Sequence, residues 1–155
     1  MNDLQIVVFS LNRELCGVDT SHVQEIILCK DIVKVAKMPK FIEGVINYRG
    51  IMVPIINLNK RFGFGETEIT KKTKIIITRI NEILLGFMVN EVPEIIKVAG
   101  NEIEPAPEIL KQAGNVYMKN IAKVNSKIIS VLDLGLILKD DELKKIEKIE
   151  NETIA

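Results

Sequence analysis

Short aliphatic runs separated by polar turns recur along most of the chain. Residues 75–77 are three isoleucines, a polar stretch follows at 79–82, and residues 83–89 are apolar again. This pattern predicts a β-hairpin. Gly17 and Gly86 lie within predicted strands, where glycine marks a bulge or a close approach of the backbone.

An internal repeat organises these strands. Residues 6–27 align with residues 75–96 without a gap, and residues 53–58 (VPIINL) are echoed by 129–134 (ISVLDL). We therefore expect a mainly β protein with two small barrel-like lobes, which pack together because about 70 residues make a marginal core. The identities are Ile6 with Ile75, Asn12 with Asn81, Leu15 with Leu84, Gly17 with Gly86, Val23 with Val92, Glu25 with Glu94, Ile26 with Ile95, and Ile27 with Ile96.

Three segments carry helix signals. Residues 39–44 and 107–114 each open with proline and close with glycine, the preferred residues for the start and the end of a helix. Residues 140–155 begin with three acidic residues and continue with lysines. Leu143, Ile146 and Ile149 form one apolar stripe there, which predicts a C-terminal amphipathic helix and tail.

Composition and charge narrow the possible functions. Lys plus Arg and Asp plus Glu both total 21, and the chain has no tryptophan. A nucleic-acid binder needs a dense basic stripe, and a single-strand binder uses aromatic platforms. We therefore expect no nucleic-acid partner. The start lacks the basic flank of a signal peptide and the apolar runs are too short to span a bilayer, so we expect a cytoplasmic protein without direct membrane insertion.

Candidate catalytic chemistry is sparse. His22 is the only histidine, residues 63–65 (GFG) lack the rest of a phosphate-binding motif, and no carboxylate pair stands out. Cys16 and Cys29 have no C-x-x-C spacing and lie in apolar surroundings, which favours two buried thiols. We expect neither an enzyme, nor a cofactor, nor a metal site.

Two charged residues stand in unusual places. Strict alternation in residues 23–27 puts Glu25 on one face with Val23 and Ile27, whereas Ile26 lies on the other. Arg49 is one of only four arginines and sits in a turn between two apolar runs. Each has a simple explanation as a solvated residue, but Arg is also enriched among interface hot spots. The pattern alone leaves both readings open.

At these residues the chain resembles the CheW family of chemotaxis coupling proteins. Residues 38–50 (MPKFIEGVINYRG) resemble the signature M-P-x-x-I-x-G-V-x-N-L-R-G, and residues 53–58 resemble V-P-x-x-D-L. Shorter matches are the V-x-E-I strand at 23–26, G-x-x-V-D-x-V at 86–92 and P-x-P at 105–107. Tyr48 replaces the usual Leu of the family, and Asn57 and Asn90 replace common Asp residues.

The resemblance implies one CheW-like domain over residues 1–155, with two five-stranded β-barrel lobes of the SH3 kind. We expect the lobes at about 15–75 and 76–139, with strand exchange of the N-terminal segment left open, and the helix and tail at 140–155. It also implies an adaptor that couples the cytoplasmic tips of methyl-accepting chemotaxis receptors to the regulatory domain of the histidine kinase CheA, in arrays at the inner face of the membrane. The implied receptor contacts are Val23, Glu25, Ile26 and Arg49, and the expected kinase contacts are Ile128, Ile129 and Val131.

Two other classes remain open. One is a CheW-like binding module of another two-component signalling scaffold, which would contain the same β unit. The other is a small β-barrel that binds a ligand or an oligonucleotide, although the balanced charge and the single histidine count against it.

Overall fold

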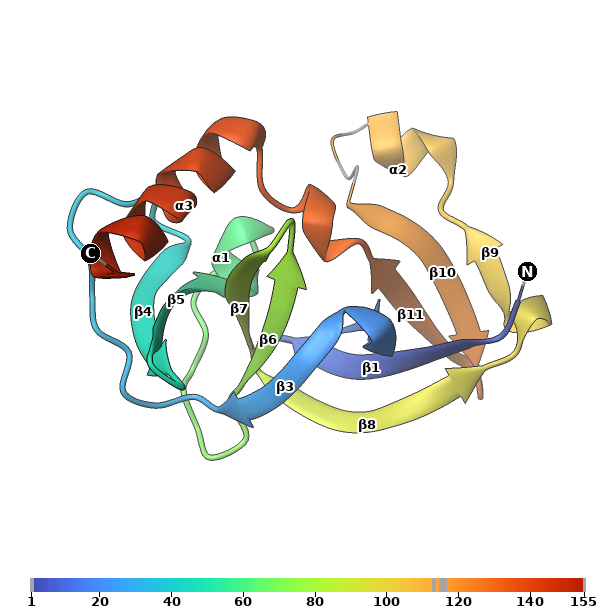
Figure 1. Cartoon of the computed structure of the whole chain (residues 1–155). Coiled ribbons are helices and arrows are strands. Elements are labelled where there is room, and N and C mark those ends of the chain that lie inside the picture. Colours follow the sequence, from blue (N-terminus) through green and yellow to red (C-terminus); the bar gives the residue numbers. More distant parts are fainter. Residues whose placement is uncertain (1, 113, 115–116, 155) are drawn as a thin grey trace.

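The computed structural model describes residues 2–112, 114 and 117–154. Its strands form two sheets that lie side by side, with a helix across the top of one of them (Figure 1). The five-stranded sheet has the order β3 (Val23–Leu28), β6 (Lys74–Ile80), β7 (Ile83–Val89), β5 (Ile51–Asn57) and β4 (Ile42–Tyr48). The six-stranded sheet has the order β8 (Glu91–Val98), β1 (Leu4–Leu11), β2 (Glu14–Asp19), β11 (Lys127–Leu132), β10 (Met118–Val124) and β9 (Ile103–Pro105).

The predicted fold class, mainly β with two lobes, is confirmed, but the sheets are open and not closed barrels. Among the described strands, β3 and β4 end one sheet, and β8 and the short β9 end the other. Short helices connect the strands: α1 (Leu58–Arg61), α2 (Glu108–Gln112) and the 3₁₀ turns η1 (Thr20–His22), η2 (Gly100–Glu102) and η3 (Leu134–Leu136). The chain then ends in α3 (Asp140–Ile154).

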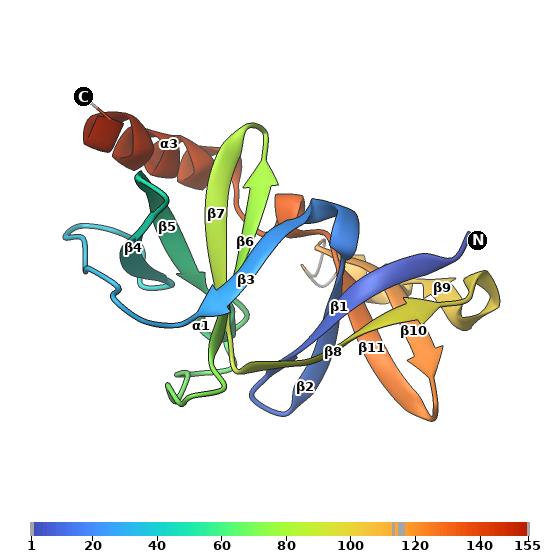
Figure 2. The ribbon, with the colours of Figure 1, turned by 60° about the horizontal axis from the view of Figure 1, so that its bottom comes forward.

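The two copies of the repeat exchange one strand. In the first copy, β1 and β2 belong to the six-stranded sheet, but β3 pairs with β6 of the second copy. In return β8 of the second copy pairs with β1, as Figure 2 shows. The registers are equivalent, since Ile6 opposes Ile96 and Ile75 opposes Ile27. The lobe limits expected from the sequence stay a prediction, because strand pairing alone does not define a folding unit.

Gly17 and Gly86 occupy matching places where strands pack closely. The β1–β2 and β6–β7 ladders keep their register at these glycines. A Cβ atom on Gly86 would lie 2.5 Å from Ile55 Cδ1, and one on Gly17 would lie 2.9 Å from Ile6 Cδ1. The glycines therefore mark close packing and not bulges.

Three buried clusters explain why the aliphatic runs are continuous. One lies against the five-stranded sheet and includes Tyr48 and Ile55, and another lies against the six-stranded sheet and includes Ile6 and Ile129. The largest cluster is shared by both sheets. A strand such as β1 is buried on both faces, because Ile6 and Val8 face one cluster while Val7 and Phe9 face the shared one. This shared core joins the lobes into one unit.

The helix predictions have mixed outcomes. α3 confirms the C-terminal helix, with Ile146 buried and Leu143 packed on the shared core, whereas the side chain of Ile149 lies outside the described residues. α2 confirms a helix within 107–114. The helix predicted at 39–44 is wrong: the amide of Ile42 bonds the Pro39 carbonyl in a turn, and β4 begins at once. Gly44, at φ 149°, makes room for the Val33 backbone and does not cap a helix.

Candidate functional site

Glu25 lies on β3, an edge strand, beside an interruption of the ladder. The register of β3 with β6 shifts between Val23 and Glu25. As a result Val23 and Ile26 both pack on the shared core, whereas Ile27 packs on the cluster of the five-stranded sheet. The strict alternation that grouped Val23 with Ile27 is therefore wrong, because an irregularity shifts the alternation by one residue.

Arg49 lies in the tight turn between β4 and β5. Arg49 and Gly50 have φ values of 51° and 85°, and the Asn47 side chain accepts a hydrogen bond from the Gly50 amide at 2.9 Å. Two successive positive φ values define a type I′ turn, which strongly prefers Asn-Gly. An arginine at the first position therefore works against the local conformational preference, so a role outside the turn is the better explanation.

Glu25, Tyr48 and Arg49 meet on the surface. The Glu25 Oε1 atom accepts hydrogen bonds from the Tyr48 hydroxyl at 2.6 Å and from Arg49 Nη2 at 2.7 Å. The guanidinium carbon lies 5.2 Å from the centre of the Tyr48 ring, close enough for a cation–π contact. The Gln24 amide reaches the same hydroxyl at 3.5 Å. Two residues implied by resemblance, Glu25 and Arg49, are thus in direct contact.

Burial shows which members of this cluster are fixed. The side chain of Arg49 is 73% exposed and that of Glu25 is 36% exposed, whereas Tyr48 is only 6% exposed and packs in the cluster of the five-stranded sheet. An ion pair this exposed contributes about 0–1 kcal/mol to stability. The pair is therefore not what holds the fold together, and its groups are available to a partner.

Tyr48 is the member that sequence reasoning missed. The sequence marks it only as a departure from the resembled signature, which has Leu at this position. Its contact with Glu25 becomes evident only in the structure, where β3 and β4, the two end strands of the sheet, approach each other at this point. The sequence signal that could have identified Tyr48 is the replacement of the signature's apolar Leu by a residue that carries a hydroxyl donor.

The expected kinase contacts separate into buried and exposed side chains. Ile129 and Val131 are 1% and 3% exposed and belong to the core of the six-stranded sheet, whereas Ile128 is 65% exposed. β11 lies between β2 and β10, so it has no free edge for an added strand. Only the side chain of Ile128 is placed to touch a partner directly.

A buried polar network lies where α1 begins. The Asn57 side chain caps α1 by accepting from the Lys60 amide at 3.2 Å, and its Nδ2 donates to Glu43 Oε1 at 2.8 Å. Lys60 Nζ lies 2.7 Å from the same carboxylate oxygen. Partial burial works to raise the pKa of Glu43, but the hydrogen bonds from Lys60 and Asn57 outweigh it and hold this pKa below its usual value. At position 57, Asn can donate a hydrogen bond to Glu43, whereas the Asp of the family pattern would place a second carboxylate beside it.

Asn90 belongs to a second part of this network. Its Oδ1 accepts from the Asn12 amide at 2.6 Å and from Asn59 Nδ2 at 2.8 Å. Asn59 is fully buried and also donates to Thr67. These bonds tie the β1–β2 turn to the segment after α1, which is a structural role.

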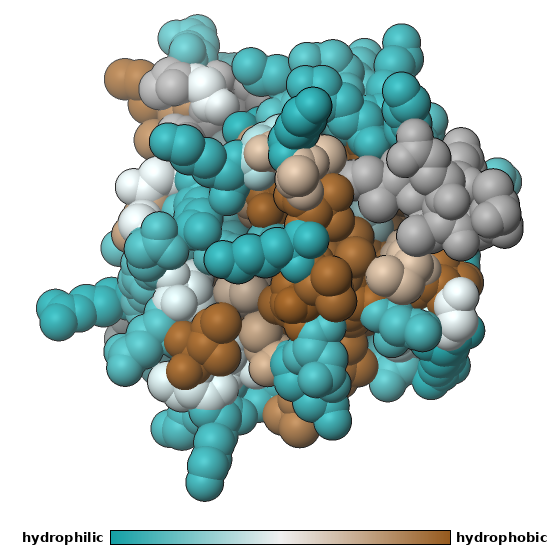
Figure 3. Space-filling view, turned by 90° about the vertical axis from the view of Figure 1, so that its left-hand side faces the viewer, coloured by the Kyte–Doolittle hydropathy of each residue, from teal (hydrophilic) through white to brown (hydrophobic). Residues whose placement is uncertain are grey.

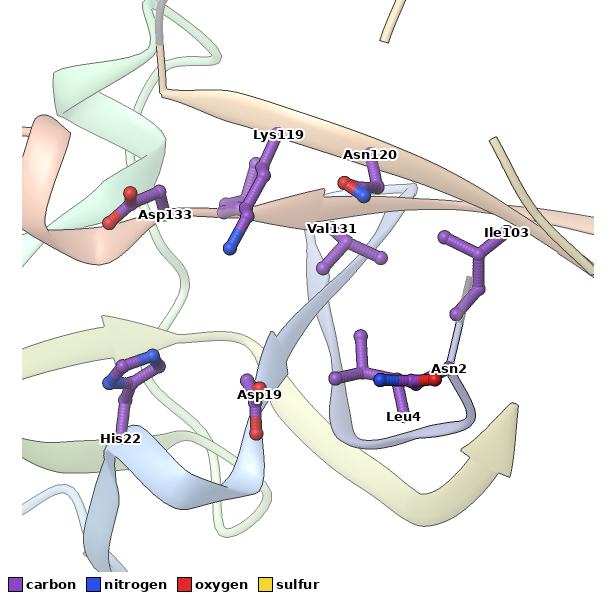
Figure 4. A pocket seen from close by; sticks show the side chains of 10 residues that line it. Asn2, Leu4, Asp19, His22, Ile103, Lys119, Asn120, Val131 and Asp133 are labelled. Atoms are coloured by element: carbon purple, nitrogen blue, oxygen red, sulfur yellow. The ribbon is translucent and has the colours of Figure 1, made fainter. Parts of the chain in front are cut away.

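A hollow of about 500 Å³ lies where η1 approaches β10 and the end of β11 (Figure 4). His22 and Asp19 line one side, and Lys119 and Asp133 line the other. Both carboxylates cap 3₁₀ turns: Asp19 accepts from the Ser21 amide and Asp133 from the Gly135 amide, each at 2.9 Å. The acids thus serve the fold, and a single imidazole beside them forms no acid–base pair.

The cysteines and the acidic residues give no sign of reactive chemistry. Burial, helped by the nearby Glu14 charge, raises the pKa of the Cys16 thiol to about 12, so this thiol stays protonated. Cys29 is half-buried, and its pKa is also raised, mainly by desolvation. Within the described part of the chain, no group of three or more His, Cys, Asp or Glu residues is placed to hold a metal ion.

A groove adjoins the Glu25 cluster. It has a volume of about 580 Å³ and runs between β3, residues 30–33 and the β4–β5 hairpin. Leu28 and Val33, at 55% and 60% exposure, border it. Figure 3 shows the side of the molecule that carries the 29–41 segment, where hydrophobic side chains gather in a central area bordered by hydrophilic ones. The cluster thus combines with apolar surface, as protein-binding sites commonly do.

The family model described as CheW-like domain matches residues 5–142. The chain belongs to this family. Chemotaxis protein CheW of Bacillus subtilis is 32% identical over 86% of each chain. Chemotaxis protein CheV3 of Helicobacter pylori is 31% identical and matches 87% of this chain, but the match covers 44% of that protein. The solved structure of the scaffolding protein TtCheW from Thermoanaerobacter tengcongensis is 37% identical, covers 92% of both chains and has a TM-score of 0.81.

A non-catalytic scaffold role agrees with membership of the CheW family, because TtCheW is described as a scaffolding protein. The fold found here, with two sheets and a C-terminal helix, is that of the TtCheW scaffold. In the described residues, no helix has both the length and the apolar character needed to cross a membrane.

Proposed function

We propose that this chain is a non-catalytic chemotaxis scaffold that couples the cytoplasmic tips of chemoreceptors to the regulatory domain of the histidine kinase CheA. Family membership supports the scaffold role. The observation that carries the coupling role is the Glu25–Tyr48–Arg49 cluster, an exposed charged site beside an apolar groove. The protein would then be located in the cytoplasm, at the receptor arrays on the inner face of the membrane.

The receptor surface consists of the Glu25–Arg49 pair together with the neighbouring β3 residues Val23 and Ile26, which are partly exposed and pack on the shared core. Arg49 projects from a type I′ turn and can reach a partner without disturbing the core. The kinase surface lies on the other sheet, where Ile128 stands exposed beside the β10–β11 turn. Placing the two contacts on different sheets lets both partners bind at once.

Coupling requires differential affinity. A receptor signal reaches the kinase only if the docked states differ in free energy across these contacts. The shared core provides the mechanical continuity between the two sheets, because it packs residues of both against one another. Single anchors in such interfaces contribute about 1–3 kcal/mol each.

The test separates the two partners. The full chain and its Arg49→Ala and Ile128→Asp variants are assayed for binding to a receptor cytoplasmic fragment and, separately, to the CheA regulatory domain. We expect Arg49→Ala to lose receptor binding only and Ile128→Asp to lose kinase binding only. Equal loss of both partners in either variant would contradict the division between the sheets.

A second assignment has an observation in its favour. CheV3 is more than twice as long as its matched region, so the CheW-like unit also occurs inside longer proteins. The chain could then serve another two-component scaffold through the same surfaces. Binding of a kinase regulatory domain other than that of CheA, encoded near this gene, would favour this alternative.

A further inference from the structure

The Glu25 carboxylate is held by one buried donor, Tyr48, and one exposed donor, Arg49. The ring of Tyr48 is buried in the core of the five-stranded sheet, so the fold sets the position of its hydroxyl. Arg49 is mostly exposed and cannot hold a carboxylate in one orientation by itself. Both donors converge on the same oxygen, Oε1. Tyr48 is therefore what orients the pair.

This orientation leaves a defined set of groups for a partner. Among the described residues, none bonds to Glu25 Oε2, and the guanidinium bonds the carboxylate through Nη2 alone. The surface thus presents an acceptor oxygen next to N–H donors, and the two charges cancel. A lone carboxylate would be drawn to Arg49 but repelled by Glu25, and a lone ammonium would meet the opposite conflict.

A group that both accepts and donates avoids this conflict. A side-chain carboxamide carries one acceptor oxygen and an NH₂ group on a single planar unit, so it can bond Arg49 and Oε2 together. We propose that Glu25, Tyr48 and Arg49 form a preorganised recognition site for the carboxamide of a partner Asn or Gln, and that Tyr48 is the positioning residue of this site. The proposal rests on the receptor-binding role proposed above.

The usual Leu of the family at this position has no hydroxyl. A leucine could fill the core position but would leave Glu25 bonded to Arg49 only. The hydroxyl therefore adds preorganisation, which raises affinity by lowering the entropy lost on binding. This chain would recognise its partner with a more tightly fixed carboxylate than a Tyr48→Leu variant would.

The first measurement is the affinity for a receptor cytoplasmic fragment, by titration calorimetry with the full chain. Tyr48→Phe keeps the ring and removes the hydroxyl, and we expect binding about three- to tenfold weaker, with a melting temperature lowered by at most about 4 °C. In a Glu25→Gln background the same substitution should have little further effect. Tyr117→Phe, which alters the only other tyrosine, is the matched control and should leave affinity unchanged.

The second measurement identifies the partner group. Each Asn and Gln at the tip of the receptor fragment is replaced by Ala, and each replacement is combined with Tyr48→Phe. We expect one carboxamide whose loss is not additive with the loss of the hydroxyl. Coupling with a charged residue only, or with none, would overturn the proposal.

The outcomes distinguish this inference from the proposed function. If Arg49→Ala weakens receptor binding and Tyr48→Phe does not, the function stands and the positioning role of Tyr48 is wrong. If neither variant alters receptor binding, the receptor-binding role fails and this inference fails with it.

Discussion

The two halves of the repeat share strand pairings and registers, but their surfaces differ. Glu25 on β3 and Glu94 on β8 occupy equivalent ladder positions, opposite Ile77 and Val8. Glu25 bonds Tyr48 and Arg49, whereas Glu94 is exposed and no hydrogen bond or ion pair to it is found among the described residues. Both copies of the repeated strand thus carry the glutamate, but among the described residues only Glu25 has side-chain partners.

The hairpin turns show the same difference. The β4–β5 turn has Arg49 at φ 51°, and the β10–β11 turn has Asn125 at φ 50°. Asn suits this left-handed position and Arg does not. One copy therefore keeps the residue that favours the turn, whereas the other has an arginine that the turn does not favour and that we propose as a receptor contact.

The largest expected effect compares the two turns in receptor binding. Arg49→Ala should weaken binding to a receptor fragment by about 10- to 100-fold, because it removes an exposed anchor and leaves Glu25 with Tyr48 alone. Asn125→Ala, the matched change in the other turn, should leave receptor binding unchanged. Calorimetric titration of both variants measures the difference. Similar losses in the two would show that the copies do not differ in function.

The next effect concerns the other sheet. Ile128→Asp should weaken docking of the CheA regulatory domain by about tenfold, since it places a charge in an apolar contact. Ile95→Asp is a suitable control, because Ile95 is 53% exposed on β8 of the same sheet. Surface plasmon resonance with immobilised kinase domain gives both affinities. If Ile95→Asp weakened binding of the kinase domain equally, the assignment of the kinase surface to Ile128 would be wrong.

A smaller effect separates Asn57 from its repeat counterpart, Asp133. Both cap a helical turn, but only Asn57 donates to a neighbouring carboxylate, Glu43. Asn57→Asp should destabilise the fold by about 1–2 kcal/mol at pH 7, because it loses this bond and places two negative charges together. Asp133→Asn should change stability by less than about 0.5 kcal/mol. Urea unfolding of both variants tests the contrast.

The pH dependence of this effect has a definite sign. The folded-state pKa of Glu43 lies below its ordinary value of 4.5, so its contribution to stability is present above that value and is lost as the pH falls through the folded-state pKa. In Asn57→Asp the new charge should raise the pKa of Glu43. The cost of the substitution should therefore shrink as the pH is lowered toward about 4. A cost that is constant with pH would show that repulsion is not its cause.

The smallest expected effect is a gain in folding stability, which accompanies a loss of receptor binding. Arg49→Asn creates the Asn-Gly pair preferred in type I′ turns and should stabilise the protein by about 0.5–1 kcal/mol while it weakens receptor binding. Asn125→Arg should destabilise the protein by a similar amount. Thermal unfolding of both variants gives the two shifts. Loss of stability in Arg49→Asn would mean that Arg49 supports the fold.

Much of the fold follows from the sequence because the repeat and the aliphatic runs are local signals. The β6–β7 hairpin and the C-terminal helix were predictable from pattern, whereas at Gly17 and Gly86 the pattern left a bulge and close packing both open. The exchange of β3 and β8 was not, since equivalent strands can pair within one copy or between copies with the same register. The false helix at 39–44 arose because a proline and a glycine that serve a turn and a close crossing mimic helix signals.

The candidate site was predicted only in part. Glu25 and Arg49 entered through resemblance, and their contact with each other depends on how the edge strand β3 curves toward the β4–β5 turn. The role of Tyr48 depends on the same curvature, because β3 and β4 are opposite end strands of the sheet and no local pattern predicts that they meet. Ile129 and Val131 were expected as contacts, but their side chains are buried, since only one face of β11 is open to solvent.

Reconstituted kinase activity tests the coupling role most directly. Receptor fragment arrays and CheA are assayed without this chain, with the full chain, and with its Arg49→Ala and Ile128→Asp variants. We predict that the full chain places CheA activity under receptor control, and that each variant keeps one partner and loses this control. Receptor control that persists in both variants, or that arises without the chain, would contradict the proposed adaptor.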